Sequence, residues 1–252
     1  MFDANAEIKN IIEWIRNWFA ENGPKADAMI GISGGKDSTI VAKLLVEALG
    51  ADRVYGVLMP NGEQKDIADS LRVVELLGIQ YEVVNIKAAV DGVLQSIKTV
   101  SNDAIINTPP RVRMTTLYAI GAGRPNGGRV CNTCNFSEDY VGYSTKFGDA
   151  AGDFSPCSAY TVTDMLQIGD ALGLPYELIH KTPSDGLCGQ TDEDKLGFTY
   201  AELDEYIRTG KMENVEKKNK IDRMHLLNLH KLKPLPMCKK LINYNVLYNV
   251  EN

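Results

Sequence analysis

The sequence has no apolar run long enough to cross a membrane, because a spanning helix needs roughly 18 consecutive apolar residues and no segment of these 252 residues approaches that length. Residues 1–5 lack the basic and apolar segments of a signal peptide. The five cysteines are an odd number, which in a chain of this size favours a reducing compartment over a disulfide framework. We therefore predict a cytoplasmic protein that binds no membrane.

The chain also has no net positive charge. The formal net charge is −6 at pH 7, whereas a large nucleic-acid interface needs a basic surface. We predict a small-molecule substrate and no nucleic-acid partner. Basic residues do outnumber acidic ones in the range 211–240, where they can form a solvated face or a wall beside a polyanionic ligand.

Histidine is scarce, with three residues in the chain. Cys131 and Cys134 form one C-x-x-C pair, but no second pair accompanies it and no histidine lies at zinc-finger spacing. Cysteines packed beside a strand are the simpler interpretation. Zinc binding or redox chemistry at this pair is the alternative.

Apolar residues are plentiful, at 44% of the chain, and their spacing alternates between helix and strand. A first helix has apolar residues at helical spacing from Ile8 to Phe19. The predicted strands cover residues 28–30, 53–59, 81–86 and 129–133, and the predicted helices between them cover 40–49, 66–77, 88–97 and 111–120. This alternation predicts an α/β fold with a Rossmann-like parallel sheet and helices on both faces. No repeat or low-complexity linker divides the chain, so we predict a single domain over residues 1–252.

One turn lies at the carboxyl end of the first predicted strand, where such sheets bind ligands. Its sequence is Gly31-Ile32-Ser33-Gly34-Gly35-Lys36-Asp37-Ser38. The glycines permit close approach of a ligand, and the free N–H groups of the following helix favour an anion. Asp37 would repel a phosphate unless a cation lay between them, so we predict a nucleotide pyrophosphate bridged to Asp37 by Mg²⁺. The alternative is a glycine-rich turn without a ligand, in which Ser38 is the helix N-cap.

This turn is not a Walker loop, in which Gly-Lys is followed by Ser or Thr, because Asp37 follows Lys36. The pattern Ser-Gly-Gly-x-Asp-Ser instead resembles the pyrophosphate loop of the ATP pyrophosphatases, which cleave ATP between its α- and β-phosphates. That resemblance implies an adenine nucleotide alpha-hydrolase-like fold. It specifies a superfamily and leaves the substrate open.

Four other stretches narrow the substrate. In chain order they are Arg111 to Met114, Asn132 to Glu138, Gly142 to Asp149 with Asp153 close behind, and Lys181 to Leu187 continuing into Gln190 to Glu193. Together with the turn they resemble the NAD synthetases, which amidate the nicotinate group of deamido-NAD⁺ to give NAD⁺. The resemblance covers residues 28–233. It implies ATP and ammonia as co-substrates, an NAD-adenylate intermediate, and the release of AMP and pyrophosphate.

The resemblance also implies roles for individual residues. Asp37 and Glu138 would be the catalytic Mg²⁺ ligands, since two carboxylates suit a hard cation that phosphate and water complete. The residues that would contact ATP are Gly31, Ile32, Ser33, Gly34, Gly35, Lys36, Asp37, Ser38, Thr133 and Ser184. Those that would contact deamido-NAD⁺ are Arg111, Lys146, Asp153, His230 and Lys231. The cations suit its diphosphate or carboxylate, and Asp153 can accept a hydrogen bond from a sugar hydroxyl.

Two positions depart from the family pattern. Asn132 stands where the family commonly has glycine, which can shift the backbone near the α-phosphate. After Pro156 many members have a lysine that contacts ATP, whereas residues 157–162 contain no cation. Either Lys36 or Lys181 supplies that charge, or ATP binds more weakly than in other members.

The resemblance further implies a homodimer with the dinucleotide near the subunit interface, and two loops, 98–110 and 181–195, that order over the substrates. The first segment is polar and ends in Pro109-Pro110, which by itself predicts a loop. Glutamine-dependent members carry an extra amidase domain, for which 252 residues leave no room, so we expect ammonia to arrive free or from another protein. Two alternatives stay open: a GMP-synthetase-like amidoligase and a nucleotide-binding regulator without turnover.

Overall fold

The computed structural model describes the chain except for residues 1, 65–66, 182–191, 235 and 237–252. Within the described part, one sheet has four parallel strands in the order β3-β2-β1-β4. The strands are β1 (Asp27–Gly31), β2 (Val54–Leu58), β3 (Gln80–Val83) and β4 (Gly128–Val130). In register, Ala28 of β1 lies opposite Val54 of β2 and Arg129 of β4. The predicted parallel sheet is confirmed.

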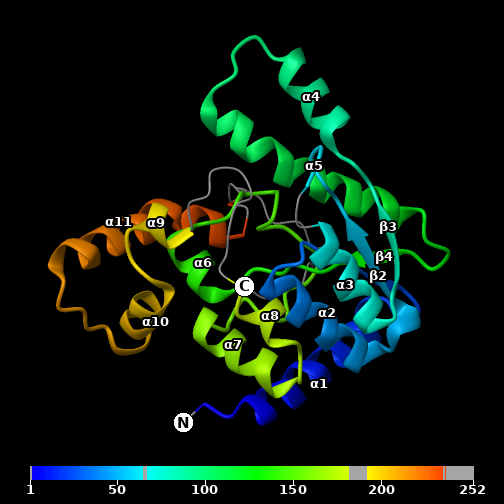
Figure 1. Cartoon of the computed structure of the whole chain (residues 1–252), viewed down its shortest axis with the longest axis horizontal. Coiled ribbons are helices and arrows are strands. Elements are labelled where there is room, and N and C mark those ends of the chain that lie inside the picture. Colours follow the sequence, from blue (N-terminus) through cyan, green and yellow to red (C-terminus); the bar gives the residue numbers. More distant parts are fainter. Residues whose placement is uncertain (1, 65–66, 182–191, 235, 237–252) are drawn as a thin grey trace, which may run out of the picture.

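Helices cover both faces of this sheet (Figure 1). One face packs against α1 (Ala4–Asn22), α2 (Lys36–Leu49), α3 (Ile67–Leu77), α7 (Val162–Ala171) and α8 (Tyr176–Ile179), and the other against α4 (Lys87–Ser96) and α5 (Asn102–Ala122). Strand β1 supplies both cores, because side chains alternate along a strand. Ala28 and Ile30 join the first cluster and Met29 joins the second, and all three are 0% exposed. A 3₁₀ turn, Ala51–Arg53, leads into β2.

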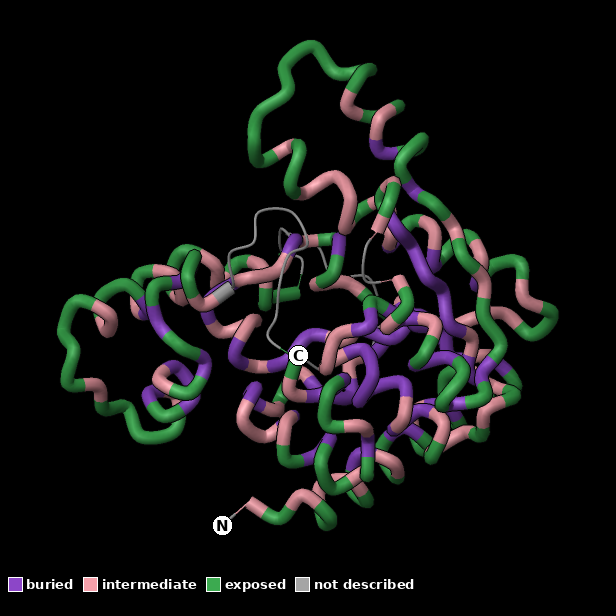
Figure 2. Tube along the Cα trace, viewed as in Figure 1, coloured by how far each residue is buried: buried purple, intermediate pink, exposed green. Residues whose placement is uncertain are grey.

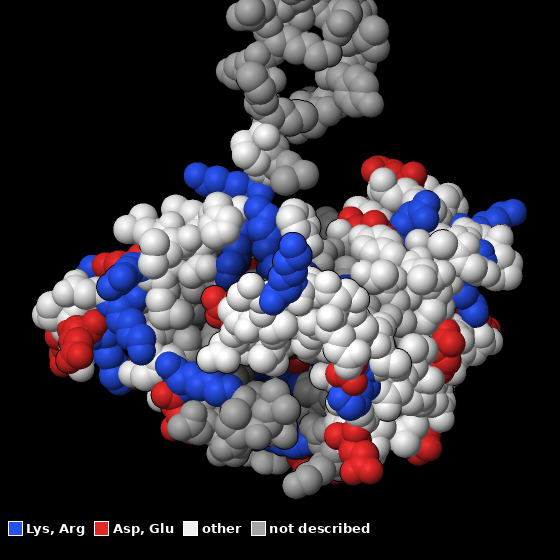
Figure 3. Space-filling model, turned by 90° about the horizontal axis from the view of Figure 1, so that it is seen from above, with Lys and Arg blue, Asp and Glu red and all other residues white. Residues whose placement is uncertain are grey.

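A second group of helices extends to one side of the sheet, at the left of Figure 1. It contains α6 (Phe136–Val141), α9 (Asp192–Leu196), α10 (Tyr200–Thr209) and α11 (Val215–Leu232). Val141, Leu203 and Ile221 form its buried centre. Figure 3 shows Lys and Arg side chains on this left-hand end. Lys217 and Lys218 form ion pairs with acidic residues there, so part of this basic surface is neutralised.

The helix α5 corrects one prediction. The pair Pro109-Pro110 predicts a loop over 98–110, but α5 begins at Asn102 and runs through both prolines. The Ser101 side chain caps it by accepting from Ala104 N at 3.2 Å. Each proline lacks the N–H that would bond the carbonyl four residues earlier, and those carbonyls belong to Ile105 and Ile106, which are 50% and 66% exposed. A carbonyl without an N–H partner can hydrogen-bond to water on an exposed residue, which is compatible with a helix that continues through the prolines.

The helices α4 and α5 form an arm that projects from the sheet (Figures 1 and 2). Much of the arm is exposed, as Figure 2 shows in green. Its exposed apolar side chains are Val93, Ile97, Val100, Ile105 and Ile106. No helix within the described ranges is both long and apolar enough to span a membrane.

Candidate active site

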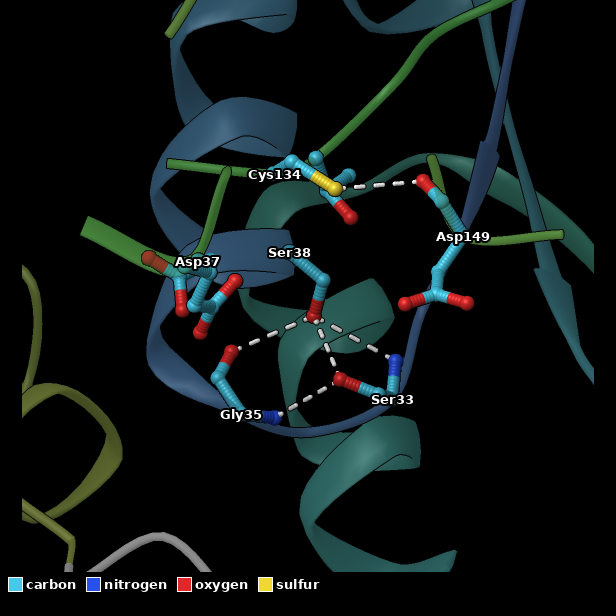
Figure 4. Close-up of a pocket in the computed structure, with 8 residues that line it drawn as sticks. Ser33, Gly35, Asp37, Ser38, Cys134 and Asp149 are labelled. Atoms are coloured by element: carbon cyan, nitrogen blue, oxygen red, sulfur yellow. Dashed lines mark hydrogen bonds between the residues drawn. The ribbon is translucent and has the colours of Figure 1, made fainter. Parts of the chain in front are cut away.

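The turn Gly31 to Ser38 joins β1 to α2, as predicted, and two serines hold it in shape (Figure 4). Ser38 Oγ donates to Gly35 O at 3.1 Å and accepts from Ser33 N at 3.3 Å. Ser33 Oγ accepts from Gly35 N at 3.2 Å. Gly34 has a φ of +77°, and a Cβ there would lie 2.9 Å from Ser70 N of α3. This position therefore excludes any side chain.

The N-terminus of α2 has no side-chain cap. Gly35 is the N-cap residue, and no side-chain hydrogen bond caps the helix. The alternative in which Ser38 caps the helix is therefore wrong. An uncapped N-terminus carries unsatisfied N–H groups and the positive end of the helix dipole, both of which favour an anion.

A cavity of about 150 Å³ opens beside this turn. It lies where β1 and β4 end, because the carboxyl ends of adjacent parallel strands meet at one edge of the sheet. Its lining residues are Ser33, Gly35, Asp37, Ser38, Thr133, Cys134, Glu138 and Asp149. The structure thus brings Asp37, Thr133 and Glu138 together, as predicted.

Asp37 is held by two neighbours. Lys36 Nζ lies 2.8 Å from Asp37 Oδ2, and Asn135 Nδ2 donates to Asp37 Oδ1 at 3.3 Å. The Lys36 side chain is 9% exposed, and its Nζ lies 5.8 Å from the centre of the Tyr200 ring. This turn therefore has a nearly buried cation beside its carboxylate.

The lining of the cavity fits a hard divalent cation. Asp37 and Glu138 offer carboxylate oxygens, and Ser33 and Thr133 offer hydroxyls. No three His, Cys, Asp or Glu side chains in the described ranges form a ready metal site. A cation such as Mg²⁺, which keeps waters and binds through one or two carboxylates plus substrate phosphates, suits this donor set.

Asp149 is a cavity residue whose role the motif left unassigned. Its Oδ1 accepts from Thr145 N at 3.0 Å, and burial raises the pKa of its carboxyl group. In Figure 4 the carboxylates of Asp149 and Asp37 appear on either side of Ser38. Asp149 stands in the quoted stretch 142–149, but only the folded chain places it beside the turn.

Asn132 joins the segment that contains Asp149 to the end of β4. Its Nδ2 donates to the carbonyls of Asp149 and Ala151 at 2.7 and 3.0 Å. Its Oδ1 accepts from Cys134 N at 2.8 Å and Ser155 Oγ at 3.1 Å. All four bonding positions of the amide are used. Asparagine at this position therefore fastens two segments, which a glycine could not do.

Four predicted substrate-contacting residues gather in a second cluster. Arg111 Nε donates to Lys146 O at 3.2 Å, and Lys146 Nζ donates to His230 O at 3.0 Å. Lys231 Nζ donates to the carbonyls of Gly142 and Ser144 at 2.7 and 2.9 Å. Burial lowers the pKa of Lys231, and the negative charge of Asp149 opposes that effect. Helices α5 and α11 thus meet at the segment 142–149 and place several cations there.

Comparison with known proteins identifies the family. A sequence profile described as NAD synthase matches residues 7–238. The chain belongs to the NAD synthase family. The NH(3)-dependent NAD(+) synthetase of Pyrococcus furiosus is 41% identical over 191 residues, which are 75% of this chain and 74% of that protein. The NH(3)-dependent NAD(+) synthetase of Archaeoglobus fulgidus is 35% identical over 239 residues, 92% of this chain and 96% of that protein.

Solved structures agree with this family. An NMN synthetase from Francisella tularensis superposes with a TM-score of 0.85 and 31% identity, covering 95% of this chain and all of that one. An NAD⁺ synthetase from Burkholderia pseudomallei superposes with a TM-score of 0.74 and 26% identity, covering 92% and 91%. These matches confirm the adenine nucleotide alpha-hydrolase-like fold.

In this NAD synthase family member, both oxygens of Asp153 already accept hydrogen bonds. Tyr118 OH donates to Oδ1 at 3.1 Å, and Val130 N donates to Oδ2 at 2.7 Å. Burial and the nearby Asp153 carboxylate raise the pKa of Tyr118 to about 12. Asp153 therefore supports the end of β4, and its contact with a sugar hydroxyl stays a prediction.

The cysteines of the described ranges are buried and form no disulfide. Cys131 Sγ donates to Asn132 O at 3.3 Å and Cys134 Sγ donates to Asp149 O at 3.2 Å. Burial raises the pKa of both thiols. Because metal binding and redox chemistry need the thiolate, this geometry favours packed cysteines over either alternative.

The two lysines that could replace the missing family lysine have different partners. Lys36 pairs with Asp37 inside the turn, whereas Lys181 Nζ pairs with Asp69 of α3. Ser184 and residues 182–191 of the second predicted loop lie outside the described residues. Lys36 is thus paired with a carboxylate that lines the cavity, and Lys181 with one on α3.

Proposed function

We propose that the protein catalyses the ATP-dependent amidation of deamido-NAD⁺ to NAD⁺ with ammonia, releasing AMP and pyrophosphate. The observation that carries this proposal is the cavity at the uncapped N-terminus of α2, which both Asp37 and Glu138 line in a chain of the NAD synthase family. The P. furiosus relative bears the name of an NH(3)-dependent NAD(+) synthetase. The main function predicted from the sequence is therefore favoured over a GMP-synthetase-like amidoligase or a regulator.

The reaction needs an activated carboxylate, because a free carboxylate is a poor electrophile. The nicotinate oxygen attacks the α-phosphorus of ATP, the bond to the β-phosphate oxygen breaks, and pyrophosphate leaves. Ammonia then attacks the carbonyl carbon of the adenylate, loses a proton, and expels AMP. The chain's tasks are to neutralise phosphate charge, align the reactants and exclude water from the adenylate.

The turn and the helix behind it would bind the pyrophosphate part of ATP. The uncapped N–H groups of α2 and the hydroxyls of Ser33 and Ser38 face this region. Thr133 lines the same cavity from the end of β4. The remaining predicted ATP contact, Ser184, lies outside the described residues.

We propose Mg²⁺ as the cation that Asp37 and Glu138 hold. When bound, it would supply positive charge to the phosphates during pyrophosphate departure. The pair lines one cavity, and its oxygen donors match the chemistry that Mg²⁺ prefers.

The second cluster would bind deamido-NAD⁺. Arg111, Lys146 and Lys231 bring cations to one place, which suits a diphosphate or a carboxylate. His230 stands beside them, and Asp149 connects this cluster to the cavity through Thr145. Substrate held there would extend toward the turn.

A mononucleotide acceptor is the second candidate, and one observation favours it. The F. tularensis NMN synthetase, at 31% identity, superposes with the higher TM-score of the two structures compared above. That name refers to a product with one nucleotide. Competition between deamido-NAD⁺ and nicotinate mononucleotide, scored as kcat/KM for each, decides between the two acceptors.

We also propose a cytoplasmic homodimer. The odd number of cysteines supports a reducing compartment. The arm supports self-association through its exposed apolar side chains, which include Val93, Ile97, Ile105 and Ile106. A monomeric mass in solution at micromolar concentration contradicts the dimer.

One assay tests the proposed function. The protein is incubated with ATP, Mg²⁺, ammonium and deamido-NAD⁺, and NAD⁺ and AMP are measured. We expect equal amounts of NAD⁺ and AMP from the complete reaction. When ammonium is left out, neither product should form. Absence of NAD⁺, with nucleotide still bound, would contradict the proposal. If NMN forms instead when nicotinate mononucleotide is the acceptor, the second candidate holds.

A further inference from the structure

A buried asparagine connects two of the three carboxylate residues that line the cavity, Asp37 and Glu138. Asn135 is 0% exposed. Its Oδ1 accepts from Glu138 N at 3.0 Å, and its Nδ2 donates to Asp37 Oδ1 at 3.3 Å. One amide group therefore contacts the side chain of Asp37 on α2 and the backbone of Glu138 on α6.

Helix capping alone does not account for asparagine at this position. Asn135 is the N-cap of α6, and Ser, Thr and Asp are also strongly preferred as N-caps. Of these four side chains, only Asn combines the cap oxygen with an amide N–H₂ group. Here that group meets Asp37. The Asn135 side chain can therefore cap α6 through its oxygen and donate to the Asp37 carboxylate through its nitrogen.

Other contacts hold the first turn of α6 in place. Phe136 N donates to Tyr160 O at 2.8 Å. Ser137 Oγ accepts from Val162 N at 2.9 Å and donates to the buried carboxylate of Asp204. Rotation of α6 would break these buried hydrogen bonds, which is costly. The backbone of Glu138 is thereby fixed relative to Asn135, and the Asn135 amide contacts Asp37.

We propose that Asn135 is a positioning residue that holds Asp37 and Glu138 together for one divalent cation bound with the nucleotide. This inference rests on the proposed function, because it assumes that ATP occupies the cavity with Mg²⁺. Asn135 acts through the two carboxylates and touches no reacting atom. Without its amide, Asp37 Oδ1 loses a donor and its side chain can turn away from Glu138.

The substitution Asn135→Ser tests this role, because serine keeps a cap oxygen but has no amide donor. Isothermal titration calorimetry measures the affinity for ATP with Mg²⁺ and for ATP in EDTA. We expect the affinity with Mg²⁺ to fall about tenfold, as for loss of a hydrogen bond to a charged group, and the affinity in EDTA to stay unchanged. The matched control is Asn214→Ser, since Asn214 caps the exposed start of α11 by accepting from Lys217 N at 3.0 Å. This control should change neither affinity.

A double-mutant cycle separates positioning from general damage. In an Asp37→Ala background, Asn135→Ser should cause no further loss of Mg²⁺-dependent affinity, because its partner is already absent. Circular dichroism checks folding, and Asn135→Thr, which also caps, replaces the serine variant if that variant is unfolded.

Two results would overturn the inference alone: an unchanged affinity with Mg²⁺ in Asn135→Ser, or an equal loss with Mg²⁺ and with EDTA. Failure of the unsubstituted protein to bind ATP with Mg²⁺ would instead overturn the proposed function, and this inference with it. The unsubstituted titration therefore distinguishes the two failures.

Discussion

Lys36 Nζ lies 2.8 Å from Asp37 Oδ2, so two adjacent residues of one turn form an ion pair. The Lys36 side chain is nearly buried, at 9% exposed. A divalent cation at Asp37 would compete with this ammonium group for the carboxylate. We therefore predict that Lys36 contacts the phosphates of ATP in place of the lysine missing after Pro156.

Lys36→Met is expected to raise the KM for ATP about tenfold, because a charged hydrogen bond to phosphate is lost. Lys181→Met is the matched comparison, since Lys181 pairs with Asp69 on α3. Steady-state kinetics at saturating deamido-NAD⁺ measures both. If the KM for ATP rises more in Lys181→Met than in Lys36→Met, Lys181 is the residue that replaces the family lysine absent after Pro156.

Asp37→Ala and Glu138→Ala are each expected to lower the rate of adenylation by about 100-fold or more, because each removes a carboxylate that neutralises charge through the metal. Release of pyrophosphate in a single turnover measures this step. Asp52→Ala, in the exposed part of the 3₁₀ turn, is the control and should keep the normal rate. Near-normal adenylation in either variant means that the cation lies elsewhere.

Asn132→Gly is expected to lower the free energy of unfolding by about 2–4 kcal/mol, because four hydrogen bonds of the buried Asn132 side chain disappear. Urea denaturation measures the change. Asn61→Gly, at an exposed bend before Gly62, serves as the control for adding a glycine. An equal loss in both variants would show that the four bonds contribute no net stability.

Tyr118 is expected to make the protein less stable at alkaline pH. Burial and Asp153 raise its pKa to about 12 in the folded chain, against about 10 when unfolded. Between these values the unfolded state holds fewer protons, so stability falls as pH rises. Tyr118→Phe should therefore lose less stability than the unsubstituted protein between pH 8 and pH 11 in urea unfolding. Identical losses of stability in both proteins would contradict the assignment of this pH dependence to Tyr118.

Ile106→Lys is expected to convert the proposed dimer to monomer, because Ile106 is 66% exposed on the arm and a buried, unpaired charge at an interface is costly. Analytical ultracentrifugation at micromolar concentration measures the mass. Leu226→Lys places the same charge at an equally exposed leucine of α11, 67% exposed, and should leave the mass unchanged. If Leu226→Lys dissociates the dimer and Ile106→Lys does not, the interface lies on α11 and not on the arm.

The strands and the turn were predictable because their signals are local. Residues 28–30 form a short apolar run, and glycine at Gly34 permits the positive φ that the turn adopts. The helix over Pro109-Pro110 was not predictable from the same local rules. Its prolines follow the exposed residues Ile105 and Ile106, and Ser101 caps the start. Packing decides which residues are exposed.

The sequence by itself determined the βαβ order, the Gly31–Ser38 turn and the family, because periodicity, turn chemistry and motif spacing are properties of neighbouring residues. Only the tertiary structure decided that Arg111, Lys146 and His230 meet, and that Asn135 lies between Asp37 and Glu138. The Arg111–Lys146, Lys146–His230 and Asn135–Asp37 contacts join residues far apart along the chain. They depend on how α2, α5, α6 and α11 pack around one edge of the sheet, and no local pattern specifies that packing.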